Sequence, residues 1–149
     1  MELLKPDRQT LILRRTIKAP RKQVYAAWTQ PEHLLRWWGA GPEYEPVIAE
    51  LELKPGGAYR FGMRHKTKGV RHIATGIFKE IVPDTKLVLT WTWEGKAQID
   101  TQVTIEFQDA PGGTLLTLTH TGFPAEPMRD DHGQGWSGAM ENLARACER

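Results

Sequence analysis

The sequence predicts an α+β fold in which one long helix covers a face of a curled antiparallel sheet. Residues 10–17 resemble a strand and are followed by short helical segments. From Val47 onward, apolar side chains recur at every second residue, as in strands with one covered face. Residues 131–149 return to helical spacing, and the apolar side of such a helix must pack on another layer.

The N-terminal part predicts one strand and two short helices. Residues 10–17 (TLILRRTI) are rich in β-branched and apolar side chains, whereas residues 1–9 are expected to be a leader. Pro20 suits the first position of a helix. Thr29-x-x-Glu32 matches a capping box and predicts the start of a second helix. The apolar residues of these helices are Val24, Ala27, Trp28, Leu34, Leu35 and Trp38.

Turn residues divide the region after Val47 into six candidate strands, and such short connections favour a meander. The turns are Pro55-Gly56-Gly57, Lys68-Gly69, Pro83-Asp84, Glu94-Gly95 and Gly112-Gly113. The apolar sets expected on the covered face are Tyr59, Phe61, Met63; Leu87, Leu89, Trp91, Trp93; Val103, Ile105, Phe107; and Leu116, Leu118, with His120 in phase.

One strand has two possible inward faces. Ile73, Thr75, Ile77 and Ile81 form one set, and Ala74, Gly76 and Phe78 form the other. A β-bulge could switch between them. The sequence leaves this phase open.

The C-terminal segment predicts an amphipathic helix that begins at Asp131. Asp131 is a suitable N-cap residue, and Gln134 is placed to complete a capping box. Trp136, Met140, Leu143 and Cys147 form one apolar stripe, which we expect to lie on the sheet.

Length and composition predict one domain over residues 1–149, because 149 residues with 40% hydrophobic and 26% charged side chains are typical of a single folded unit. No apolar run approaches the roughly 18 residues of a membrane helix, and the N-terminus lacks the layout of a signal peptide. We therefore expect a cytoplasmic protein with no membrane partner. The single cysteine, Cys147, excludes an internal disulfide and a zinc finger.

Basic residues are concentrated in two segments despite a net charge of only +2. Residues 1–22 contain seven Lys and Arg against two acids, and residues 60–72 contain five against none. No helix-turn-helix, RNA-recognition or finger signature accompanies them. We interpret these segments as solvated faces and expect no nucleic-acid partner.

Several motifs, in order and spanning nearly the whole chain, resemble the heat-shock-protein ATPase activator (AHSA) homologues of the START-like (SRPBCC) superfamily. They are Ile17-x-Ala-Pro-x-x-x-Val-Tyr-x-Ala-Trp-Thr-x-Pro-Glu-x-Leu, Arg36-Trp37-Trp38-Gly39, Pro55-Gly56-Gly57-x-Tyr59-Arg60, Gly76-x-x-x-Glu80-Ile81-Val82-Pro83, Lys86-Leu87-Val88-x-Thr90-Trp91 and Gly135-Trp136. The resemblance implies the helix-grip fold, a curved antiparallel sheet wrapped around a long C-terminal helix. The branch includes small-molecule binders and polyketide-processing relatives, so fold alone leaves function open.

Two features depart from that family. The activators that name the branch carry a separate chaperone-binding domain, whereas this sequence shows only a short leader before residue 10. The segment from residue 64 to 72 is also unusually basic.

In a helix-grip fold the space between sheet and terminal helix is often a cavity, and ligand cavities are mostly apolar with a few polar groups. The candidate ligand-binding residues are Trp38, Tyr59, Phe61, Met63, Ile73, Thr75, Trp91, Trp93, Val103, Ile105, Leu118, His120, Trp136 and Met140. Their aromatic character would suit a planar or lipid-like ligand. Aromatic residues and methionines at strand and helix spacing belong to an ordinary core far more often than to a pocket.

His120 is the main polar candidate, because it continues the inward phase of its strand. It could bond a ligand or act as an acid or base near neutral pH. A buried neutral histidine bonded to a carbonyl or to a Trp N–H would produce the same pattern. Asp130-Asp131-His132 is better explained by helix capping than by a metal site, and no nucleotide or cofactor motif is present. We expect no metal, cofactor or catalytic carboxylate pair.

Three functional hypotheses follow. The leading one is binding of a small hydrophobic or aromatic molecule between sheet and terminal helix. The second is an enzyme of cyclase, dehydratase or hydrolase type with His120 as acid or base. The third is a stress-response or co-chaperone-like interaction with a protein partner through the basic surface. A homodimer is possible, since end strands of a sheet can pair between chains.

Overall fold

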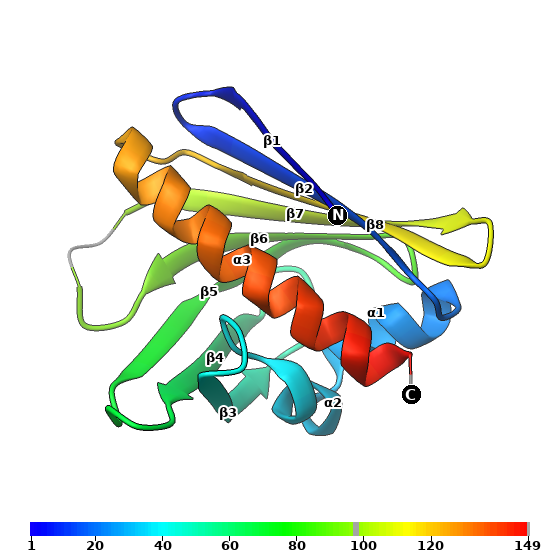
Figure 1. Cartoon of the computed structure of the whole chain (residues 1–149), viewed down its shortest axis with the longest axis horizontal. Coiled ribbons are helices and arrows are strands. Elements are labelled where there is room, and N and C mark those ends of the chain that lie inside the picture. Colours follow the sequence, from blue (N-terminus) through cyan, green and yellow to red (C-terminus); the bar gives the residue numbers. More distant parts are fainter. Residues whose placement is uncertain (97–98, 149) are drawn as a thin grey trace.

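The fold is built on one antiparallel sheet that curves around a long helix (Figure 1). The computed structural model describes residues 1–96 and 99–148. Its strands are β1 (Glu2–Asp7), β2 (Thr10–Ile17), β3 (Tyr44–Leu51), β4 (Ala58–His65), β5 (Arg71–Val82), β6 (Lys86–Trp93), β7 (Thr101–Ala110) and β8 (Gly113–Thr121). Its helices are α1 (Arg21–Thr29), α2 (Pro31–Trp37) and α3 (Glu126–Cys147).

The eight strands are ordered β1-β2-β8-β7-β6-β5-β4-β3. Strands β3 to β8 form the predicted meander. Strand β2 pairs with β8 and extends the sheet toward the edge strand β1. Figure 1 shows α3 lying across the sheet, with α1 and α2 toward its C-terminal end. This is the helix-grip arrangement that the sequence resemblance implies. The predicted turns are also confirmed; Gly112 and Asp84, for example, adopt left-handed φ values of 79° and 61°.

Residues 2–7, expected to belong to a leader, form the edge strand β1. All six residues are exposed and one is proline, so no alternating apolar pattern indicates this strand. Two polar contacts join it to α3: Arg129 donates to the Asp7 carbonyl at 2.6 Å, and Lys5 pairs with Asp130 at 2.9 Å. Strand β1 is therefore attached by pairing with β2 and by α3 rather than by core packing.

Strand β5 resolves the phase that the sequence left open. Ala74 and Phe78 are buried, whereas Ile77 is exposed. An irregularity between Phe78 and Glu80 shifts the register with β6 and brings Ile81 against the core. The candidate residues Ile73 and Thr75 alternate with the buried set, so they lie on the opposite face of the sheet.

All three predicted helix starts differ from the structure, the first by a single residue, because Pro20 is the N-cap residue of α1 rather than its first helical residue. Helix α3 begins at Glu126, five residues before Asp131, because Pro127 is tolerated in the first turn, where its missing N–H costs no hydrogen bond. Helix α2 begins at Pro31 after Gln30, and the expected capping box is not formed. The Thr29 hydroxyl instead donates to the Tyr25 carbonyl one turn back, at 2.9 Å.

A single buried cluster lies between the sheet and the helices. It includes five of the six tryptophans, and the sixth, Trp93, is partly buried and packs against it. Aromatic pairs such as Tyr25 and Phe107, with ring centroids 5.5 Å apart, join α1 to β7. None of the described helices combines the length and the apolar character needed to cross a bilayer.

Candidate functional site

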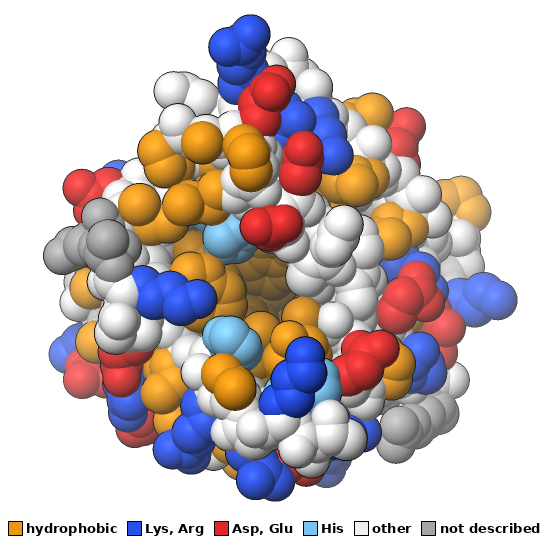
Figure 2. Space-filling model, turned by 60° about the vertical axis from the view of Figure 1, so that its left-hand side comes forward, with side chains coloured by type: hydrophobic (Ala, Val, Ile, Leu, Met, Phe, Trp, Pro, Cys, Tyr) orange, Lys and Arg blue, Asp and Glu red, His pale blue; other side chains and the backbone are white. Residues whose placement is uncertain are grey.

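A cavity of about 870 Å³ lies between the N-terminal half of α3 and the sheet. Its wall comes from the end of β4, the start of β5, the end of β6 and the segment after α2. Figure 2 looks into this hollow, whose wall is largely hydrophobic and whose rim carries histidine and charged side chains. The volume falls in the range of about 300–1,000 Å³ that is usual for small-molecule sites.

Small residues on α3 create the space. Gly135 and Ala139 both line the cavity from the helix and carry too little side chain to fill it. Between them Trp136 adds a large aromatic surface. Alternation along β6 places Trp91 and Trp93 on the same side of the sheet, with ring centroids 5.3 Å apart.

Five of the predicted ligand-binding residues line this cavity: Trp38, Met63, Trp91, Trp93 and Trp136. The other nine do not. Ile73 and Thr75 are on the outer face of the sheet, where the Thr75 hydroxyl donates to the Tyr59 carbonyl at 3.1 Å. Tyr59, Phe61, Val103, Ile105, Leu118, His120 and Met140 are at most 2% exposed and fill the core below the cavity. Periodicity identifies the inner face of a strand, but the helix decides which part of that face stays uncovered.

His120 holds Trp136 in place. The Trp136 indole N–H donates to His120 Nδ1 at 3.0 Å, so this nitrogen carries no proton. His120 Nε2–H then donates to Thr101 Oγ1 at 2.9 Å, and the Thr101 hydroxyl donates to the Trp91 carbonyl at 2.7 Å. Burial, and secondarily the proximity of His132, lowers the pKa of His120 well below its usual value. Both ring nitrogens are occupied in a neutral imidazole, which leaves none for proton exchange with a ligand.

His132 is a wall residue that the sequence reasoning missed. Its Nε2 accepts from the Trp93 indole N–H at 2.9 Å, and its Nδ1–H donates to the Met128 carbonyl at 2.8 Å. Burial lowers the pKa of His132 despite the Met128 hydrogen bond, which raises it. Its spacing of four residues from Trp136 is the sequence signal that places both side chains on one face of a helix.

The rim also includes residues that periodicity could not identify, among them Tyr44, His72, Lys96 and Asp131. His72 contacts Trp93, with ring centroids 6.2 Å apart. Partial burial, and then the positive charge of Lys96, lowers the pKa of His72. Within the described parts of the chain, no three His, Cys, Asp or Glu side chains are grouped so that they could hold a metal ion.

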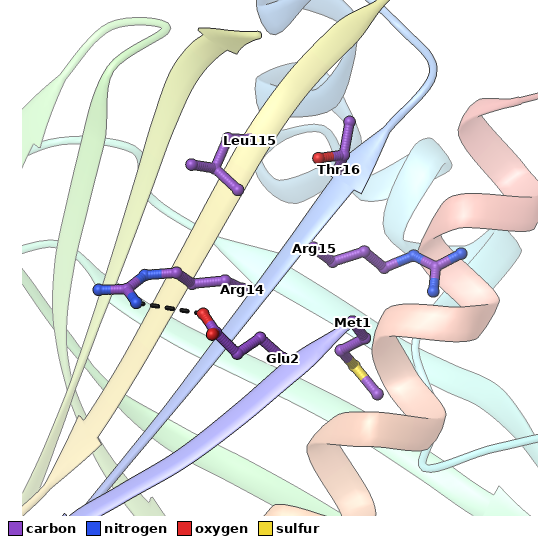
Figure 3. Close-up of a pocket in the computed structure, with 6 residues that line it drawn as sticks. All are labelled: Met1, Glu2, Arg14, Arg15, Thr16 and Leu115. Atoms are coloured by element: carbon purple, nitrogen blue, oxygen red, sulfur yellow. Dashed lines mark hydrogen bonds and ion pairs between the residues drawn. The ribbon is translucent and has the colours of Figure 1, made fainter. Parts of the chain in front are cut away.

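A second hollow of about 650 Å³ lies beside the start of β1 (Figure 3). Glu2 and Arg14 form an ion pair there at 3.2 Å, and the Arg15 side chain points to α3, where it pairs with Glu141. The charged side chains of Glu2, Arg14 and Arg15 are thus engaged in ion pairs. The cavity under α3 is the stronger candidate for a ligand site.

Comparison with known proteins agrees with this architecture. A model of the family "Activator of Hsp90 ATPase homolog 1-like protein" matches residues 18–148. No curated protein matches the chain.

Solved structures show the same fold. A protein from Chromobacterium violaceum is 25% identical and superposes with a TM-score of 0.86 over 95% of this chain and 98% of its own. A protein from Arthrobacter aurescens is 21% identical, with a TM-score of 0.84 over 99% and 91% of the two chains. An AHSA1-like protein from Aeromonas hydrophila is 23% identical, with a TM-score of 0.76 over 93% and 92%.

Proposed function

The chain belongs to the family of activator of Hsp90 ATPase homolog 1-like proteins, and from this premise we propose that it binds a small hydrophobic or aromatic molecule in the cavity under α3. The observation that carries the proposal is the cavity itself. Four tryptophans line it, together with Met63 and Met128. Flat aromatic walls and adaptable thioethers favour a planar apolar ligand.

The polar groups of the wall favour binding rather than chemistry. His120 lies behind Trp136 and is fully hydrogen-bonded, and His132 is bonded through both ring nitrogens. An acid–base step through either residue would first have to break these bonds. The arrangement therefore supports a binder over the cyclase, dehydratase or hydrolase hypothesis.

A residue that fills the cavity tests the proposal. A Cβ at Gly135 would meet the Ala40 Cβ at 3.7 Å, an ordinary contact, so Gly135→Leu is compatible with the helix and directs its longer side chain into the space. Gly133→Ala is the matched control, because Gly133 lies on the same helix outside the cavity wall and its added Cβ meets Leu3 at 3.9 Å.

The probe is N-phenyl-1-naphthylamine, an uncharged dye whose fluorescence rises in apolar sites. We expect saturable binding to the wild-type protein and to Gly133→Ala, with a higher Tm in the presence of the dye. Gly135→Leu should lose both effects while remaining folded. Equal dye binding by Gly135→Leu and the wild type would place the dye elsewhere and contradict the proposal.

A protein-partner role is the second candidate, favoured by the turn between β4 and β5. Lys66, Lys68 and Arg71 are exposed there, and none forms an ion pair with another residue that the structure describes. A partner recognised through this turn would be acidic, and its binding would weaken with salt. The test is capture of one defined acidic partner, lost in Lys66→Glu/Lys68→Glu and retained in Lys22→Glu, where the charge reversal lies on α1.

A further inference from the structure

The four tryptophans of the cavity wall differ in what their N–H groups do. Trp93 and Trp136 donate to His132 and His120. The indole nitrogens of Trp38 and Trp91 are buried, and neither finds an acceptor among the described residues. Leaving a buried donor unpaired costs folding free energy, so such groups call for a specific explanation.

The two unpaired donors belong to one patch of the wall. The Trp38 and Trp91 rings have centroids 5.9 Å apart, and both pack against Trp136, at 5.8 and 5.0 Å. Trp38 comes from the end of α2 and Trp91 from β6. Two separate elements thus bring to the same aromatic surface two indole rings whose buried N–H groups find no acceptor among the described residues.

The surroundings of this patch are apolar and uncharged. Lys96 is the one cationic side chain of the cavity wall within the described residues, and it is exposed at the rim. A carboxylate placed deep against Trp38 and Trp91 would lose its hydration without gaining a cation. An uncharged acceptor, such as a ketone or aldehyde oxygen, loses much less hydration free energy when it is buried there.

We propose that the ligand is an aromatic molecule carrying an uncharged carbonyl oxygen, which accepts a hydrogen bond from Trp38, Trp91 or both. This inference rests on the proposed function, because it assumes that the cavity takes a ligand. Both nitrogens are buried, so the proposal requires the indole rings to turn before a ligand oxygen can reach them. The carbonyl group then supplies an acceptor that the described residues do not provide.

Trp28 provides an internal comparison. Its N–H is also buried and finds no acceptor among the described residues, yet Trp28 does not line the cavity. It packs against Trp37, with ring centroids 4.8 Å apart, and touches the wall residues Trp38 and Trp136 at 6.1 Å each. A ligand oxygen in the cavity should therefore form its hydrogen bond with Trp38 or Trp91, and the Trp28 N–H signal should move much less than theirs.

The experiment compares two probes of nearly equal shape, fluorene and 9-fluorenone, which differ by the carbonyl group. Calorimetric titration gives their Kd values, and ¹⁵N-indole NMR follows the six tryptophan N–H signals, assigned by Trp→Phe variants. We expect 9-fluorenone to bind about fivefold tighter, a typical worth of one neutral hydrogen bond. The Trp38 or Trp91 N–H proton should move to higher frequency with 9-fluorenone and not with fluorene.

Variants locate the effect. Trp91→Phe and Trp38→Phe should reduce the preference for 9-fluorenone and leave fluorene binding in place, whereas Trp28→Phe should keep the preference. Because the calorimetric comparison of the two probes on the wild-type protein needs no variant, a variant that fails to fold does not remove the test. Equal affinity for the two probes, with unchanged Trp38 and Trp91 signals, would overturn the carbonyl assignment and leave the proposed function standing. Failure of both probes to bind would overturn this inference, and failure of the naphthylamine dye as well would overturn the proposed function.

Discussion

The Trp136 indole N–H donates to His120 Nδ1 at 3.0 Å, in a core where both side chains are almost completely shielded from water. The bond fixes one large face of the cavity wall to the sheet through β8. It also gives His120, the main polar candidate of the sequence, a structural contact with the wall. Through its two side-chain hydrogen bonds, His120 orients the wall.

Loss of this acceptor should destabilise the protein. His120→Leu leaves the Trp136 N–H unpaired in the core, which costs about 1–3 kcal/mol in the free energy of unfolding. A double-mutant cycle with Trp136→Phe, measured by urea denaturation, should give a coupling of about 0.5–3 kcal/mol. A coupling of zero would mean that the two side chains contribute independently.

Stability should fall as the pH is lowered through about 6.5, the ordinary histidine pKa in the unfolded chain. The folded-state pKa values of His120 and His132 are both lowered, mainly by burial, so the unfolded chain binds more protons below that pH. Asp131 opposes and Lys96 adds to the shift at His132. Urea denaturation at pH 7.5, 6.5 and 5.5 measures the loss, which should be smaller in His120→Asn and His132→Gln. Equal wild-type stability at pH 7.5 and 5.5 would contradict the neutral assignment of the two buried histidines.

Two glycines on α3 should respond to alanine with opposite signs. Gly133→Ala meets only ordinary contacts and should stabilise the helix by up to about 1 kcal/mol. At Gly138 an added Cβ would lie 2.4 Å from the Ala40 carbonyl oxygen, so Gly138→Ala should destabilise by about 1–3 kcal/mol. Chemical denaturation of both variants checks the pair, and a neutral Gly138→Ala would show that α3 lies farther from the segment after α2.

Removal of the Arg129 guanidinium should loosen β1 selectively. Arg129 bonds the Asp7 carbonyl from α3 and is only 8% exposed. Arg129→Leu should increase amide hydrogen exchange in residues 2–7 and leave the β7–β8 pairing protected. Uniformly increased exchange across the sheet would instead indicate global destabilisation.

The fold was predictable because each of its signals is local. Alternating side chains and turn residues identify β3 to β8 one strand at a time, and the family motifs add their order. Strand β1 was not predicted because all its residues are exposed and show no alternation of apolar and polar side chains. The inward face of β5 depends on a bulge that a single sequence does not determine.

The cavity was harder to predict because it depends on distance between layers. Trp91 and Val103 have the same inward phase, yet Trp91 lines the cavity and Val103 is packed beneath the helix. The small residues Gly135 and Ala139 on α3 determine which of these side chains the helix leaves uncovered. Neither residue has a functional group that would mark a binding site in the sequence. Tyr44 and Lys96 lie at strand ends and turns, where periodicity carries no information.

All six tryptophans form one chain of ring contacts, from Trp37 and Trp28 through Trp38, Trp136 and Trp91 to Trp93. Neighbouring rings lie about 5–6 Å apart, close enough for excitation to pass between them before emission. A light-absorbing guest in the cavity would therefore dim the emission of the whole set and alter its near-ultraviolet circular dichroism. Tryptophan emission can therefore report binding in a screen of candidate compounds without any label on the protein.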